Sequence, residues 1–191
     1  MDEQPGFEFI AGSIALCFVD TYGDRGGDGV ERLTALAALE AWLAAAALVP
    51  RKPASVSREH LRGAVALREA IYRCGLQAMA GKPLPLRDVE IINAASRVPP
   101  LRPQLDDSEL FMVASRPVGG AFSVIAADAL RLFGSPQRER IRQCPGCSMM
   151  FVDTSRPGRR LWCSSARGCG NRAKVRNLRA RRARVEKGNK N

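Results

Sequence analysis

Histidine is almost missing from this sequence of 191 residues, which contains His60 alone, and aromatic residues make up only 6% of it. A single histidine near a helix start is more often a surface or capping residue than a catalytic base, so Ser/His/Asp catalysis has no support. The glycine-containing segment 23–29 lacks both the GxGxxG spacing and a Walker lysine. These absences argue against an enzyme.

Long apolar runs are also missing. The longest one, residues 33–49, is rich in alanine, carries Glu40 and is too short for a comfortable membrane span. The first five residues have neither the basic nor the apolar part of a signal peptide. We therefore expect a cytoplasmic protein with no membrane partner, in which clustered cysteines hold a metal more often than they form disulfides.

Positive charge is abundant, but it is concentrated at one end of the chain. From residue 138 onward there are 16 Lys and Arg residues against three acids, a net charge of +13, whereas the first 137 residues have a net charge of −2. This asymmetry is typical of a polyanion-binding module attached to a neutral domain.

Apolar periodicity and helix-stopping residues predict a multihelical amino-terminal part. Helices are expected at about 31–48, 57–80, 86–97 and 124–133, and a short one begins at Gln137. Residues 14–21 could form either a strand or a buried helix. The apolar runs ELFMVAS and AFSVIA, on either side of residues 116–120, predict a β-hairpin.

The expected fold class is therefore mainly α with a short β-hairpin (α+β). We divide the chain into a helical domain at 1–137 and a small carboxy-terminal zinc module with a basic helix at 138–191.

Four of the six cysteines have metal-ligand spacing. Cys144 and Cys147 form a CxxC knuckle around Pro-Gly, and Cys163 and Cys169 follow after 15 and five intervening residues. Four thiolates complete a tetrahedral structural Zn²⁺ site with no open position. A redox pair at Cys144 and Cys147 would leave the other two cysteines unexplained, and an iron site with the same ligands stays open. Cys17 and Cys74 lie in apolar segments and are expected in the core.

The chain ends in a basic segment that can be helical. Residues 171–185 contain no Gly or Pro, and Val175, Leu178 and Val185 fall near one side, where they could pack on the zinc knuckle. The expected nucleic-acid contacts are the basic side chains Arg172, Lys174, Arg176, Arg179, Arg181, Arg182 and Arg184.

Charge alone leaves alternatives for the basic segment. Phosphate contacts give affinity without sequence readout, so DNA is the expected partner and RNA stays open. A solvated tail with no partner is the third interpretation. Only Trp162 and Phe151 are aromatic residues near this segment, which argues against stacking along a single strand.

The carboxy-terminal motifs resemble the CGNR zinc finger over residues 142–184. The resemblance rests on Phe151–Arg156, Arg159–Ser164 and Cys169–Lys174, with residues 165–168 replacing the usual family sequence before the last cysteine. The resemblance implies zinc at the four cysteines, in a module of bacterial transcription regulators.

Residues 7–135 more loosely resemble the ABATE domain, through Leu16–Thr21 and Leu39–Leu43. Together the two resemblances imply a stress-related transcription regulator with structural zinc. The helical domain would then sense a small effector or form a homodimer. A rival interpretation places an enzyme site, or the effector site, around Asp20, Thr21, Tyr22 and Arg25.

Overall fold

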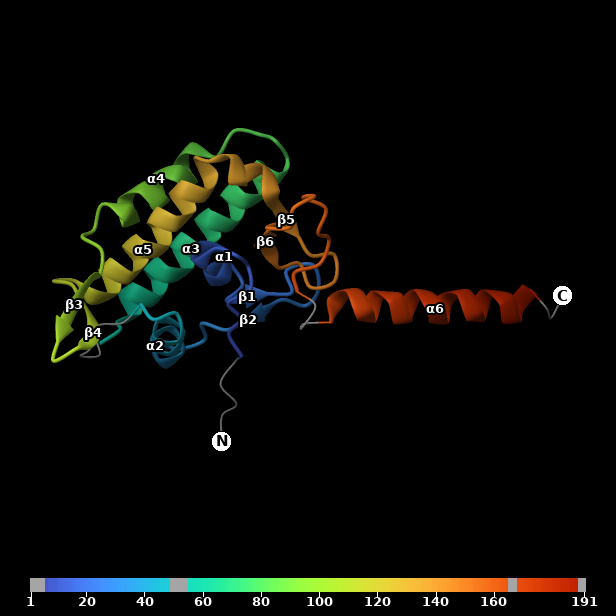
Figure 1. The fold of residues 1–191 in the computed structure, drawn as a ribbon, viewed down its shortest axis with the longest axis horizontal. Coiled ribbons are helices and arrows are strands. Elements are labelled where there is room, and N and C mark those ends of the chain that lie inside the picture. Colours follow the sequence, from blue (N-terminus) through green and yellow to red (C-terminus); the bar gives the residue numbers. More distant parts are fainter. Residues whose placement is uncertain (1–5, 49–54, 165–167, 189–191) are drawn as a thin grey trace.

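The structure is a computed structural model that describes residues 6–48, 55–164 and 168–188, without the side chains of 183–188. Its main body consists of five helices: α1 (Ile14–Val19), α2 (Leu36–Ala45), α3 (Arg58–Met79), α4 (Leu86–Ser96) and α5 (Pro117–Phe133) (Figure 1). The long helix α3 packs against α1, α4 and α5. Phe18, Trp42 and Ile71 are fully buried in the core among these helices.

Local sequence signals account for the longest helix of this body. The Ser57 hydroxyl accepts a hydrogen bond from the His60 backbone N–H at 3.2 Å, and the His60 imidazole accepts one from the Ser57 N–H at 3.1 Å. This capping box satisfies two N–H groups that the first turn would otherwise leave unpaired. Gly81, with φ +65°, follows the last turn. The predicted helices at 57–80 and 86–97 are confirmed, and His60 is a capping residue.

Three short antiparallel strand pairs complete the fold: β1 (Tyr22–Gly23) with β2 (Val30–Glu31), β3 (Arg102–Asp106) with β4 (Glu109–Val113), and β5 (Ile141–Gln143) with β6 (Met150–Val152). The mainly α class with short strands is confirmed. The ambiguous segment 14–21 contains helix α1, whose first turn is capped by Ser13.

The position predicted for the hairpin was wrong. The turn lies at Asp107 and Ser108, both with positive φ, and the run AFSVIA belongs to α5. Gly120 does not form a turn: a Cβ built on it would lie 3.1 Å from the Pro99 carbonyl oxygen and 3.3 Å from the Leu101 nitrogen. The glycine allows close packing of α5 against the preceding segment.

The helix predicted at 31–48 is shorter than expected. Glu31 lies in β2, where it pairs with Tyr22, and its carboxylate accepts hydrogen bonds from Arg68 and from the Leu33 N–H. The helix α2 therefore begins only at Leu36. Of these partners, Tyr22 and Arg68 lie outside the segment 31–48 whose periodicity predicted the helix.

The strand pair β5–β6 packs on the helical body. A single turn of 3₁₀ helix (Pro136–Arg140), at the place of the expected short helix, leads into β5. The Val152 N–H donates to the Ala11 carbonyl at 2.8 Å, and Met150 and Phe151 are buried in the same core as the helices. The division of the chain at residue 137 stays a prediction. Among the helices of the described residues, none combines the length and the apolar composition that spanning a lipid bilayer requires.

Candidate metal centre and basic helix

The turn between β5 and β6 places the first two cysteines on one side. The Cys144 carbonyl accepts a hydrogen bond from the Ser148 N–H at 2.8 Å, and the Cys144 N–H donates to the Met149 carbonyl at 2.9 Å. Ser148 adopts a positive φ of 57°, which closes the turn. A tight knuckle of this kind directs both sulfurs toward a common point.

All four sulfurs of the predicted set converge. The Sγ atoms of Cys144, Cys147, Cys163 and Cys169 lie within 4.8 Å of one another. The Cys147–Cys163 and Cys163–Cys169 sulfur pairs are separated by 3.6 and 3.8 Å. A tetrahedral zinc ion with Zn–S bonds of about 2.3 Å requires sulfurs about 3.8 Å apart. None of the four is in a disulfide. The cluster therefore fits one tetrahedral metal ion.

The electrostatics of the four-cysteine cluster also favour a bound cation. Burial raises the pKa of the Cys147 thiol to about 11, and the Cys144 sulfur acts in the same direction. Burial acts to raise the pKa of Cys144 too, but backbone N–H groups of Cys163 and Gly146 stabilise its thiolate and bring the pKa to about 7. Because neighbouring thiolates repel one another, all four can coexist only when a divalent ion replaces their protons.

Trp162 covers the cluster between two glycines. A Cβ on Gly146 would lie 3.3 Å from Cζ3 of the indole, and a Cβ on Gly170 would lie 3.0 Å from its Cδ1. The Trp162 carbonyl accepts a hydrogen bond from Arg160 Nε at 2.8 Å, and the Arg160 guanidinium lies over the Phe151 ring. Trp162 is thereby fixed in position, and each glycine is required by the close approach of the ring.

Asp153 organises the loop between β6 and Trp162. Its fully buried carboxylate accepts hydrogen bonds from the backbone N–H groups of Ser155 at 2.9 Å and Arg160 at 2.8 Å. Hydrogen bonding to Ser155 is the main reason that its pKa lies below the ordinary value. Sequence reasoning assigned no role to Asp153, although an Asp-x-Ser sequence is a common turn signal.

Replacing Gly170 by Ala should loosen this packing. Because the Trp162 ring is held between Gly146 and Gly170, an added methyl group must displace the ring, at a cost of roughly 1–3 kcal/mol. We expect faster zinc loss from Gly170→Ala to a competing chelator, followed with a colorimetric zinc indicator. Gly63→Ala in α3 is the matched control, because the nearest atom to its Cβ is 3.9 Å away. Equal zinc-release rates in the two variants would contradict the role assigned to Gly170.

The basic helix starts at the metal centre and leaves the body. Helix α6 (Cys169–Gly188) begins with a ligand cysteine, and Arg172 Nη2 donates to the Cys169 sulfur at 3.1 Å. Beyond this turn α6 extends away from the rest of the molecule (Figure 1). Val175 and Leu178 are 41% and 50% exposed, so the expectation that they pack on the knuckle was wrong. The side chain of Val185 lies outside the described part.

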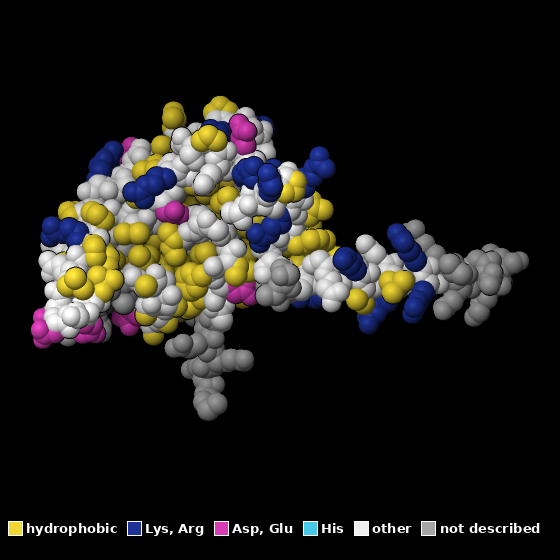
Figure 2. Space-filling model, in the orientation of Figure 1, with side chains coloured by type: hydrophobic (Ala, Val, Ile, Leu, Met, Phe, Trp, Pro, Cys, Tyr) yellow, Lys and Arg dark blue, Asp and Glu magenta, His cyan; other side chains and the backbone are white. Residues whose placement is uncertain are grey.

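The predicted contact residues lie along this free helix. Six of them have exposed side chains: Arg172, Lys174, Arg176, Arg179, Arg181 and Arg182. Arg184 belongs to α6, but its side chain lies outside the described residues. Figure 2 shows Lys and Arg side chains along α6, whereas acidic side chains gather at the opposite end of the molecule, where β3 and β4 lie.

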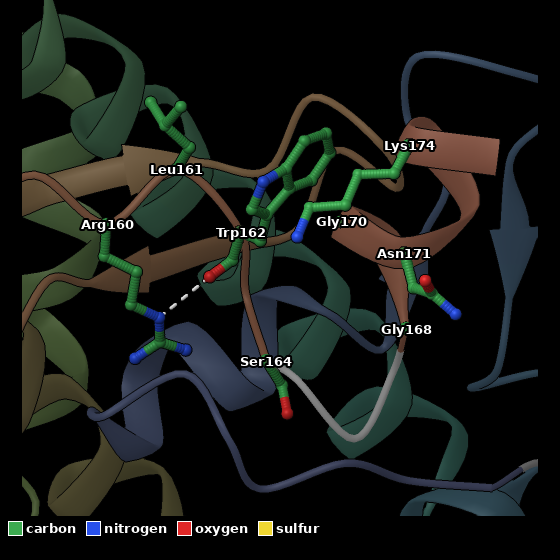
Figure 3. A pocket seen from close by; sticks show the side chains of 8 residues that line it. All are labelled: Arg160, Leu161, Trp162, Ser164, Gly168, Gly170, Asn171 and Lys174. Atoms are coloured by element: carbon green, nitrogen blue, oxygen red, sulfur yellow. Dashed lines mark hydrogen bonds between the residues drawn. The ribbon is translucent and has the colours of Figure 1, made fainter. Parts of the chain in front are cut away.

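A pocket lies beside the first turns of α6 (Figure 3). Its volume is about 700 Å³, and its lining consists of Arg160, Leu161, Trp162, Ser164, Gly168, Gly170, Asn171 and Lys174. A smaller groove of about 450 Å³ adjoins it and is lined by Asn171 with Arg172, Val175, Arg176 and Arg179.

The residues considered for a ligand in the helical domain interact with one another and with α3. Arg25 makes two hydrogen bonds to Glu69, at 2.8 and 2.9 Å, and lies over the Tyr72 ring. The Thr21 hydroxyl donates to the Phe18 carbonyl. Asp20 is buried, and its carbonyl accepts from Arg32. Tyr22 lies beneath Arg25. The structure thus places these residues in a network of internal contacts, and a ligand there stays a prediction.

Comparison with known families gives two adjoining matches. Residues 12–136 match ABATE, described as "Putative stress-induced transcription regulator", and residues 140–182 match the CGNR zinc finger. A search of curated proteins found no match. The second match contains all four converging cysteines, so the finger model and the sulfur geometry together support structural zinc.

Proposed function

This chain belongs to the ABATE family and carries a CGNR zinc finger, and from that premise we propose that it is a zinc-dependent DNA-binding transcription regulator. The observation that carries the proposal is α6: a free, arginine-rich helix anchored to the metal cluster through Cys169. Zinc would hold the start of this helix in a defined position, and its basic side chains would contact the phosphate backbone. The helical domain would regulate binding by sensing an effector or by dimerising.

The dimensions of α6 suit a groove of duplex DNA. Its 20 residues correspond to a length of about 30 Å. Arg172, Arg176 and Arg179 are spaced at i, i+4 and i+7, so they share one face, whereas Lys174 and Arg181 fall on the opposite face. The major groove is about 12 Å wide and admits a helix. Cations on both faces could therefore reach phosphates on both sides of the groove.

The same features could serve RNA. A-form RNA has a deep, narrow major groove that a helix enters poorly, so the regular α6 favours duplex DNA. Competition at fixed salt between duplex DNA, structured RNA and heparin separates the two partners. If structured RNA displaces a labelled DNA duplex from the protein at concentrations far below those at which unlabelled DNA does so, the RNA-binding interpretation replaces the DNA proposal.

The proposal predicts a strong dependence of DNA binding on salt. Replacing Arg176, Arg179 and Arg181 by Ala should reduce the slope of log K against log salt by roughly 2–3, because each lost phosphate contact releases about one counterion fewer. Fluorescence anisotropy with a labelled duplex over a salt series measures the slope. The matched control replaces Arg62 in α3, Arg87 in α4 and Arg102 in β3, which are exposed and lie outside α6, and so removes the same charge. An equal slope in both triple variants would exclude α6 as the contact surface.

A further inference from the structure

The pocket at the start of α6 is separate from the arginine face of that helix. Lys174 lines the pocket, whereas Arg172, Arg176 and Arg179 line the neighbouring groove, and Asn171 lines both. A nucleic-acid strand that follows the groove would therefore reach the pocket by passing over Asn171. The arginines can contact the phosphate backbone of a nucleic acid without this pocket. The ligand of the pocket therefore has to be inferred from the residues that line it.

The pocket combines an apolar wall with polar groups that have no acidic neighbour in the lining. Leu161 is 65% exposed, and Trp162 presents part of its indole to the pocket (Figure 3). Asn171 and Lys174 lie three residues apart on α6; the Lys174 side chain extends toward the Trp162 ring, whereas the Asn171 amide points away from it (Figure 3). Neither side chain makes a hydrogen bond or ion pair with another residue of the described ranges. A cation beside an aromatic ring matches a nucleobase that carries a phosphate.

The aromatic wall is held in place before any ligand arrives. Gly146 and Gly170 confine the Trp162 ring, and Arg160 binds its carbonyl. A fixed aromatic side chain loses little conformational freedom when a base stacks on it, and such stacking is worth roughly 1–3 kcal/mol per base. Bases inside an intact duplex are already stacked and paired, so only an unpaired or extruded base can enter a side pocket.

Resting on the proposed function, we propose that this pocket binds one unpaired nucleotide of a DNA duplex, its base against Trp162 and Leu161 and its phosphate near Lys174. The chain then prefers duplexes that contain an unpaired or easily unstacked nucleotide over fully paired ones. The volume of about 700 Å³ is within the usual range for small-molecule pockets and exceeds what a single phosphate needs.

The test compares two duplexes of the same sequence, one fully paired and one with a single unpaired nucleotide, bound to the full zinc-loaded chain. We expect about tenfold tighter binding of the second duplex, as stacking of one base predicts, together with quenching of Trp162 emission. Trp42 is 1% exposed and serves as the unresponsive second tryptophan. Fluorescence anisotropy gives both affinities, and tryptophan emission gives the quenching.

Substitutions avoid Trp162, because its loss could unfold the finger. In the variant Leu161→Ala, which lies outside the arginine groove, the preference should fall by roughly threefold or more, while affinity for the paired duplex stays within about twofold. Equal affinity of the unaltered chain for both duplexes, or a preference without Trp162 quenching, would overturn this inference and leave the DNA-binding proposal intact. Binding to neither duplex would overturn the proposed function itself.

Discussion

Replacing Cys147 by Ser is expected to release the zinc and, with it, the ordered start of α6. Structural zinc sites of this kind contribute roughly 10–16 kcal/mol of apparent binding free energy, and serine is a poor replacement for a thiolate. Cys147 is the least buried of the four cysteines, so substitution there disturbs core packing least. We expect zinc content to fall to near zero and DNA affinity to fall more than 100-fold. Metal analysis and anisotropy measure the two quantities.

A buried cysteine outside the cluster provides the control. Burial raises the pKa of the Cys74 thiol to about 11, so this group stays protonated and is a poor metal ligand. Cys74→Ala should keep one zinc per chain and its DNA affinity. The helical body should stay folded in Cys147→Ser, because its core is built from other residues, and circular dichroism would show it. One retained zinc in Cys147→Ser would contradict the assignment of the four ligands.

The metal centre was predictable because zinc ligands are particular residue types, whose identity and spacing are visible in the sequence. Cysteines at the spacing of residues 144, 147, 163 and 169 have few uses other than a metal site, whatever the surrounding fold. The ends of helix α3 were also predictable from local sequence: Ser57 with His60 marks its start, and Gly81 follows its end. Signals of this kind act within one turn of chain, so a single sequence contains them completely.

Features that depend on distant contacts were not predictable. Gly119 and Gly120 suggest a turn, but Gly120 serves the close packing of α5 against residues 99–101. The apolar Val175 and Leu178 suggest packing on the knuckle, but α6 leaves the body and keeps them exposed. In both cases the prediction was wrong because the tertiary arrangement, and not the local sequence, decides whether the residue packs against another segment.

The pocket beside Trp162 was missed for the same reason. Sequence reasoning counted only two aromatic residues near the basic segment and judged them too few for stacking along a strand. The structure brings Trp162 next to Lys174 and Asn171 because Cys163 and Cys169 are held at one metal site. A single aromatic ring in a defined pocket suffices for one base, which a count of aromatics cannot reveal.

Arg68 links the strands β1 and β2 to helix α3, and its loss should strongly destabilise the helical body. Its guanidinium is 3% exposed and makes two hydrogen bonds to Glu31, at 2.7 and 2.8 Å, and one to Glu69 at 2.9 Å. Glu69 in turn holds Arg25, next to Gly26, where a Cβ would lie 2.4 Å from the Ser148 hydroxyl of the zinc knuckle. The backbone at Gly26, next to this network, therefore packs closely against the zinc knuckle.

In the variant Arg68→Met, the Glu31 carboxylate should stay partly buried and so still lack part of its hydration. The cation that offsets this free-energy cost would be gone. Breaking a buried ion pair costs roughly 3–5 kcal/mol, and the lower value applies because Glu31 is 35% exposed. We expect a drop of about 3 kcal/mol in unfolding free energy, or roughly 6–12 °C in Tm. Urea and thermal unfolding measure these changes. Arg97→Met, which breaks the exposed pair with Glu90, should cost less than about 1 kcal/mol.

The dependence of this loss on pH separates lost charge pairing from lost packing. Burial acts to raise the pKa of Glu31, but hydrogen bonding to Arg68 holds it below the ordinary value. A carboxyl group whose pKa is lower in the folded than in the unfolded chain stabilises the fold at pH values above its unfolded pKa. That stabilisation disappears as the pH falls through the pKa of the folded state. The difference between the native chain and Arg68→Met should therefore shrink from pH 7 toward about pH 3. A difference that stays constant would show that Arg68 acts through packing alone, and Arg68→Met combined with Glu31→Gln should then recover no stability.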